Sequence, residues 1–197
     1  MAFLTIKLQN MKPLTISLFL LLICPLCFSQ MAPKIPEPSF VNHIYCLMGD
    51  SLISLEQIDA HYMMKPPVPF AKNEAGLSMS YDKSPTRIKQ ADSIRFVIKL
   101  GSNMMDPTQM LKLYSLRPKK GNREAVLNSY QDHYYKSESK DNTAGLKFNV
   151  QKSGNDVFII IPAMRLASGE YAFMTSMLVS GGGPHTTYTL YAFGIDP

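Results

Sequence analysis

From residue 76 onward, apolar and polar residues alternate with a period of two in one short segment after another. The clearest segment runs from Ile94 to Leu100, where every second side chain is apolar. Further strand-like segments are Met110–Leu116, Leu146–Gln151, Val157–Ile161, Tyr171–Val179 and Thr187–Ile195. Successive side chains of a strand point to opposite faces, so this pattern predicts many short strands. With Gly, Asn and Pro at the turns between them, the chain is expected to form an all-β, antiparallel sandwich or barrel.

Residues 41–57 predict a hairpin that precedes these strands. The runs Ile44–Met48 and Ser51–Leu55 flank Gly49-Asp50, a dipeptide suited to a two-residue turn. The alternative is a strand followed by a helix that begins near Ser54, because Ser54 and Gln57 have the residue types and spacing of a capping box. We favour the hairpin.

Residues 123–136 are compatible with two kinds of element. Val126, Leu127, Tyr130 and Tyr134 fit the apolar stripe of an amphipathic helix, although strands surround the segment in sequence. The choice between strand and helix stays open here.

Residues 1–29 have the pattern of a cleaved secretory signal peptide. Lys12 precedes the apolar run Leu14–Leu22, and small residues at Cys27 and Ser29 suit cleavage after Ser29. The run is too short to cross a membrane as a helix. We therefore expect an exported protein, periplasmic or extracellular, with no membrane span in the mature chain.

The rest of the chain is expected to form one domain. Removing residues 1–29 from the 197-residue chain leaves 168 residues, enough for a substantial core. An extended, proline-rich arm at residues 30–40 would precede a single domain at residues 41–197. Two of the 20 Lys and Arg residues lie in the signal, which leaves 18 against 15 Asp and Glu. This balance is only a weak indication of anionic partners. Whether Met1 or Met11 is the start, and whether the protein carries a lipid anchor, stay open.

The cysteine and histidine patterns predict no catalytic or metal site. Cys24 and Cys27 have C-x-x-C spacing but lie within the signal, so the mature chain keeps only Cys46, in an apolar run typical of a buried thiol. The four histidines lack metal-ligand spacing, and no G-x-S-x-G nucleophile motif is present. We therefore expect no cofactor and no metal. Cu(I) binding by the methionines that follow His61 is the alternative.

The segment Leu166–Tyr171 has the spacing L-x-x-G-x-Y at the entrance to a predicted strand. This spacing is similar to a tyrosine corner, in which the phenol hydroxyl bonds a backbone carbonyl a few residues upstream. Gly169 and Tyr171 are thus predicted to be structural residues.

Four short motifs carry a resemblance to a known group of proteins. They are Phe28-Ser29-Gln30, Ile44-Tyr45, residues 168–173 (SGEYAF) and residues 191–196 (YAFGID). Together they resemble exported, immunoglobulin-like β-sandwich proteins of Bacteroidota-type bacteria, many of which have no assigned activity. The resemblance implies export and an antiparallel, immunoglobulin-like sandwich, and it implies no catalytic residue. The likeness concerns architecture alone, since the chain has no Trp and no cysteine pair in the predicted domain.

A glycine-rich loop between the last two predicted strands is the first candidate for ligand contact. Loops at one end of a sandwich commonly carry binding residues. The residues of this candidate are Gly181, Gly182, Gly183, His185 and Tyr188.

A basic turn is the second candidate, as a contact for a polyanion such as an acidic glycan. Its residues are Arg117, Lys119, Lys120 and Arg123. No aromatic residues are interleaved with these cations, so nucleic acid is not an expected partner.

The sequence therefore predicts an exported, non-enzymatic module with a binding, adhesion or scaffold role in the cell envelope. Its partner is unknown, with an envelope protein or glycan as the expectation. The alternative is a small envelope hydrolase acting on glycan or peptide, because two catalytic carboxylates can lie far apart in a sequence.

Overall fold

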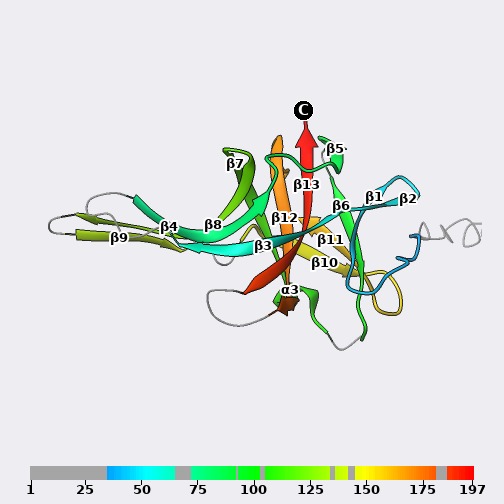
Figure 1. Ribbon diagram of the computed structural model, residues 1–197. Helices are drawn as coiled ribbons and strands as arrows, with labels where there is room; N and C mark the ends of the chain where they lie inside the picture. The colour runs from blue at the N-terminus through cyan, green and yellow to red at the C-terminus, as the bar shows by residue number, and fades with distance from the viewer. Residues whose placement is uncertain are drawn as a thin grey trace, which may run out of the picture. The chain divides into compact units, whose positions relative to one another are not determined.

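A computed structural model describes residues 35–64, 72–91, 93–102, 105–133, 136–141, 145–180 and 186–197. The chain divides into two compact units between Ile35 and Pro36, and the second unit contains all the described strands (Figure 1). The predicted signal peptide and the glycine-rich loop at residues 181–185 lie outside the described residues.

One sheet has five antiparallel strands in the order β10–β11–β6–β1–β2. These strands are Phe148–Lys152, Val157–Pro162, Arg95–Lys99, Ile44–Met48 and Ser51–Ser54. In the β1–β2 hairpin, Met48 lies opposite Ser51 across Gly49-Asp50. The predicted hairpin is confirmed, and the strand–helix alternative is wrong because the chain continues from Ser54 into another strand.

The second sheet closes on itself through six strands, and we call this ring the barrel. Its order is β12–β7–β8–β4–β3–β13, and β13 pairs in turn with β12. These strands are Gly169–Ser180, Leu111–Lys119, Asn122–His133, Lys72–Ser80, Glu56–Met64 and Thr187–Asp196. Residues 123–133 of the segment that the sequence left open between strand and helix belong to a strand, β8, whereas Tyr134 lies outside the described residues.

Two short strands and one helical turn complete the described elements. β5 (Arg87–Lys89) pairs in parallel with β13, and β9 (Lys136–Asp141) pairs with β8. The turn α3 (Pro107–Met110) leads directly into β7. Within the described part of the chain, no helix has both the length and the apolar character needed to cross a membrane.

β12 and β13 form a wall shared by two apolar cores. Tyr171 and Phe173 of β12 and Phe193 of β13 join Phe96 of β6 in a core between the two sheets. The ring centroids of Phe96 and Phe173 lie 4.9 Å apart, and those of Phe96 and Phe193 lie 4.8 Å apart. Ala172, the next residue along β12, belongs instead to the barrel interior. The same strands are therefore buried on both faces.

Small side chains fill much of the barrel interior. All six strands of the ring contribute to this second core, which includes Ala60, Ala125, Ala172 and Ala192. A ring of six strands is narrower than the eight-stranded rings whose interiors just accommodate ordinary side chains. The alanines leave the room that the buried Tyr114 occupies.

The structure confirms the all-β class, with antiparallel pairing between the described strands except for β5 and β13, and it confirms two sheets that pack together. The sequence did not distinguish an open sheet from a closed one, because a period of two describes a strand in either. The immunoglobulin-like form of the sandwich is not confirmed, since one of the two sheets is closed.

Cys46 is buried and free, as its apolar surroundings in the sequence predict. Burial raises the pKa of its thiol to about 11. The thiol therefore stays protonated near neutral pH, which is the unreactive form.

The Tyr171 hydroxyl donates a hydrogen bond to the Ala167 carbonyl oxygen at 2.9 Å, as the L-x-x-G-x-Y spacing predicts. The Tyr171 ring also stacks on Phe193, with ring centroids 5.6 Å apart. A Cβ built on Gly169 would lie 3.8 Å from this ring, an ordinary contact, so the space beside the ring does not itself require a glycine. The bond thus ties the loop before β12 to the inter-sheet core.

Replacing Tyr171 with phenylalanine is expected to lower the free energy of unfolding by about 1 kcal/mol, because one hydrogen bond is lost and the exposed Ala167 remains open to water. Urea midpoints measure the change. Tyr45→Phe is the matched control, because Tyr45 is also buried but its hydroxyl has no hydrogen bond within the described residues. Equal midpoints for Tyr171→Phe and the wild type would contradict the structural role.

Candidate functional site

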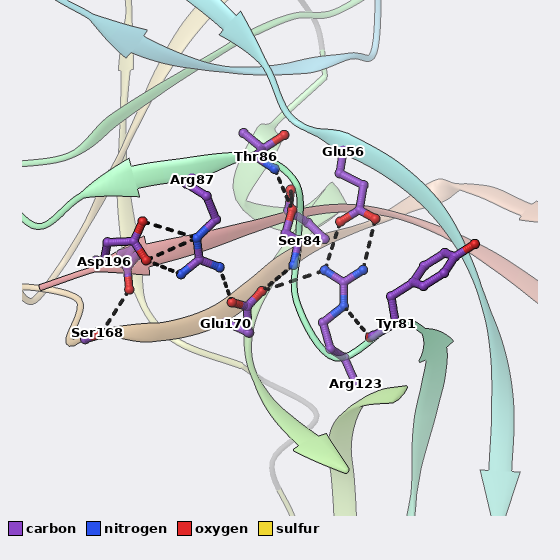
Figure 2. A network of polar contacts seen from close by, with 11 residues as sticks. Glu56, Tyr81, Ser84, Thr86, Arg87, Arg123, Ser168, Glu170 and Asp196 are labelled. Carbon is purple, nitrogen blue, oxygen red and sulfur yellow. Dashed lines mark hydrogen bonds and ion pairs between the residues drawn. The ribbon is translucent and has the colours of Figure 1, made fainter. Parts of the chain in front are cut away.

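One end of the barrel interior carries a buried charge, Arg123 of β8, whose side chain is 0% exposed. Its guanidinium donates two hydrogen bonds to the carboxylate of Glu56 on β3, at 2.8 and 3.0 Å. It also donates to the backbone carbonyl of Tyr81 at 3.1 Å, as Figure 2 shows, and to that of Ser80 at 3.3 Å. These partners occupy most of its donors, so Arg123 ties β8 to β3 and to the turn after β4.

Glu170 connects this buried arginine to a second one nearer the surface. Its carboxylate is 5% exposed and lies 3.8 Å from the Arg123 guanidinium. The same carboxylate accepts a hydrogen bond from the backbone amide of Ser84 at 2.9 Å and another from Nη1 of Arg87. Arg87 in turn donates from Nε to both oxygens of Asp196, at 3.2 and 3.3 Å. Figure 2 shows the resulting row of alternating charges, Glu56, Arg123, Glu170, Arg87 and Asp196.

The absence of a side chain at Gly194 makes room for this row. A Cβ built on Gly194 would lie 1.7 Å from Nη1 of Arg87 and 2.6 Å from Oε1 of Glu170. Any larger residue would displace the Arg87 guanidinium from between its two carboxylates. The glycine in the sequence Phe193-Gly194-Ile195 therefore permits the observed close approach of Arg87 and Glu170.

The charges in this row stabilise one another. The hydrogen bond from Arg87 holds the pKa of Asp196 below its usual range. The hydrogen bond to Asp196, with that to Glu170, raises the pKa of Arg87. Both groups are therefore charged at neutral pH, and their side chains are fixed relative to each other.

The cations of the predicted basic turn on β7 are largely neutralised by carboxylates from β8 and β4. Arg117 donates to Glu74 at 2.6 and 3.3 Å and to Glu124 at 3.0 Å, and the hydrogen bonds raise its pKa. Lys119 also donates to Glu124, at 3.2 Å. Lys120 lies exposed in the turn itself. The fourth predicted residue, Arg123, is buried with its side chain inside the barrel, so it cannot contact a ligand at the surface.

A cleft of about 570 Å³ lies beside the charged row. Its polar lining includes Lys83, Arg87, Arg117, Ser168 and Asp196. The Ser168 hydroxyl donates to the carbonyl oxygen of Ile195 at 3.1 Å, which fixes its position at the cleft. Hydrogen-bond donors and acceptors thus converge on one concave surface, which we call the barrel-end cleft.

The predicted binding residues separate in the structure. Arg117 is the one basic-turn residue that lines the barrel-end cleft. Gly181, Gly182, Gly183 and His185 lie outside the described residues. Tyr188 packs partly against the barrel interior, near the end of β13 opposite to Asp196.

Sequence reasoning missed the other polar residues of the cleft, Lys83, Arg87, Ser168 and Asp196. They come from separate segments, and no motif joins them. The one local signal was Gly194, a glycine within an otherwise aromatic and apolar strand, which is a position where close approach is common.

Among the described residues, no group of three or more His, Cys, Asp or Glu side chains is placed to hold a metal ion. His43 instead sits in an aromatic cluster, with its ring centroid 4.9 Å from Tyr45 and 4.8 Å from Tyr191. Its Nε2 lies 2.6 Å from the Ser54 hydroxyl oxygen. Burial lowers the pKa of His43, because the aromatic surroundings disfavour the charged ring.

The His43 environment predicts a loss of stability in mild acid. The pKa of the ring is lower in the folded than in the unfolded chain, so the unfolded state binds the proton first as the pH falls below about 6.5. The stability present above that pH is therefore lost toward the folded pKa. In urea unfolding at about pH 7.5 and 5.5, His43→Gln should show a smaller drop in midpoint than the wild type. The exposed His61→Gln is the control, and an equal drop for all three proteins would refute the prediction.

Comparison with models of known protein families, with curated proteins and with solved structures finds no match for this chain.

Proposed function

We propose that this protein is an exported, non-enzymatic binding module that holds a glycan of the cell envelope in the barrel-end cleft. The observation that carries the proposal is the fixed pair of Arg87 and Asp196 at the cleft, with Ser168 and Lys83 also in its lining. Sugar hydroxyls both donate and accept hydrogen bonds, so they match a surface that presents both kinds of group. Because Arg87, Asp196 and Ser168 are already held in place, these three lose little side-chain freedom on binding.

The charge of the cleft supports a neutral or weakly charged glycan. Arg87 and Arg117 each face two carboxylates, so most of the positive charge at the cleft is already compensated. A polyanion site would be expected to leave more of its cations without carboxylate neighbours. This balance favours a hydroxyl-rich ligand over the polyanion inferred from the basic turn.

Export and the immunoglobulin-like relationship belong to the same proposal. The pattern of residues 1–29 supports export to the periplasm or beyond, and the hydrogen bond of Tyr171 supports the architectural likeness. N-terminal sequencing of the protein recovered from the cell envelope should begin at Gln30. A full-length cytoplasmic product would count against export.

Retention on immobilised envelope polysaccharides, neutral and acidic, tests the binding role. Lys83→Ala/Ser168→Ala should weaken retention on a neutral glycan by roughly tenfold, the effect of one or two lost hydrogen bonds. Lys89→Ala is the matched control, because Lys89 is exposed on the neighbouring strand β5 and does not line the cleft. Arg87 and Arg117 are left intact, since each also holds a buried carboxylate.

Three results would overturn the proposal. If the protein is retained on acidic polymers alone, and this retention is lost as the salt concentration rises, the function is polyanion binding. Release of soluble sugars from the glycan would show a hydrolase. Equal retention of the cleft variant and the control would place binding elsewhere on the surface.

A further inference from the structure

β2 is a sheet edge that carries no charge. Among the described strands, β2, β5, β9 and β10 each pair with one neighbour only. The other three edges contain Lys, Arg or acidic residues, whereas β2 has the sequence Ser-Leu-Ile-Ser. Charged residues commonly protect an exposed edge from pairing with another chain. β2 lacks this protection.

The outward backbone groups of β2 belong to Leu52 and Ser54. The amide of Leu55 donates to the carbonyl oxygen of Ile44 in β1 at 3.2 Å. Hydrogen-bonding direction alternates along an antiparallel strand, so Ile53 also directs its backbone groups toward β1. The amide and carbonyl groups of Leu52 and Ser54 therefore point away from the sheet, where no described strand meets them.

We propose that β2 pairs with β2 of a second copy of this chain, antiparallel about a two-fold axis at Ile53. Residues opposite each other in such a pair must direct their backbone groups either toward each other or away. With Ile53 opposite the partner's Ile53, Leu52 of each chain lies opposite Ser54 of the other. All the outward backbone groups of both strands are then paired. The pairing joins two five-stranded sheets into one of ten strands.

The side chains around β2 favour this occupant. Ile53 and Met48, which lies beside the hairpin turn, are each 41% exposed. Phe40 is 67% exposed, and its ring contacts His43, which bonds Ser54 at the other end of β2. An isologous interface needs a self-complementary surface, and an apolar edge meets that need. Two copies of a positively charged chain also meet there without like charges opposite each other along β2.

The dependence of molecular mass on protein concentration tests the pairing. Sedimentation equilibrium up to about 1 mM, the range for a small transient interface, should show a monomer–dimer equilibrium. Ile53→Lys should shift the equilibrium to the monomer at every concentration, because two lysines would face each other on the axis. Met164→Lys is the matched control, since Met164 is 65% exposed and lies beyond β11, two strands away from β1.

A disulfide trap tests the register. Facing residues whose backbone groups point away from each other have Cα atoms about 4.5 Å apart, within the range that a disulfide spans. Ile53→Cys should therefore form a covalent dimer under mild oxidation, whereas Ser51→Cys should not, because Ser51 would face Leu55 of the partner subunit. Because Cys46 lies directly opposite Ile53 in the β1–β2 hairpin, the cysteine variants also carry Cys46→Ala, which prevents a disulfide within one chain.

The outcomes are distinct. A monomer at all concentrations, with no covalent dimer from Ile53→Cys, would overturn the proposal and leave the edge to a strand of another protein. A dimer that Ile53→Lys does not weaken would place the interface elsewhere. Trapping by Leu52→Cys instead of Ile53→Cys would overturn the register. None of these results depends on ligand binding in the barrel-end cleft.

Discussion

Replacing Arg123 with methionine is expected to lower the free energy of unfolding by about 3–5 kcal/mol, the effect of breaking a buried ion pair. The variant leaves Glu56 and Glu170 at the barrel end without the guanidinium that now faces both. Glu170 keeps the amide of Ser84 and the guanidinium of Arg87, so Glu56 bears most of the penalty. Denaturation with urea measures the loss.

Two further variants make the test specific. Lys119→Met removes a cation that is 35% exposed and leaves Glu124 paired with Arg117, so the loss should be clearly smaller. The double variant Arg123→Met/Glu56→Leu also removes the unpaired carboxylate of Glu56. It should recover much of the stability, because replacing a buried ion pair with apolar residues often leaves the stability unchanged. A loss below about 1 kcal/mol for Arg123→Met would mean that water reaches the barrel end and solvates Glu56.

Replacing Phe96 with alanine is expected to cost about 3–5 kcal/mol, the usual result for a fully buried phenylalanine. The ring lies on β6 and contacts Phe173 and Phe193 of the shared wall, so its removal opens a cavity between the two sheets. Phe96→Leu keeps most of the volume and should cost about 1.5 kcal/mol or less.

Phe40→Ala is the matched control for Phe96→Ala, because Phe40 is exposed and its loss should change stability by no more than about 0.5 kcal/mol. Chemical denaturation monitored by fluorescence and by circular dichroism should give coincident transitions for every variant if both cores unfold together. A biphasic transition for Phe96→Ala would show instead that the barrel survives without the five-stranded sheet.

The features that the sequence predicted correctly are local ones. A two-residue turn between short apolar runs predicted the hairpin of β1 and β2, and the L-x-x-G-x-Y spacing predicted the hydrogen bond of Tyr171. Each depends on residues within about one turn or strand, whose conformations are set by neighbouring residues. Period-two alternation likewise predicted strands, because it reports the two faces of a single strand.

Closure of the barrel and assembly of the cleft depend on residues far apart in the chain. β3 and β13 pair where Asp59 and Thr189 meet, 130 residues apart in sequence. The basic turn was only a candidate polyanion contact in the sequence, and its neutralisation could not be predicted because the carboxylates of Glu56 and Glu74 come from other strands. Local patterns contain no record of such pairings, so neither the closed ring nor the charge balance at the cleft could be predicted.

The shared wall also has a consequence for when this protein can fold. β13 contributes Leu190 and Ala192 to the barrel interior and Tyr191 and Phe193 to the inter-sheet core, and it is the last described strand in chain order. A growing polypeptide that has not yet reached residue 187 lacks part of both cores and cannot close the ring. Because so many native contacts wait for this segment, folding is delayed until nearly all the domain has been synthesised. If the proposed export is correct, this delay would keep the polypeptide unfolded while it crosses the membrane.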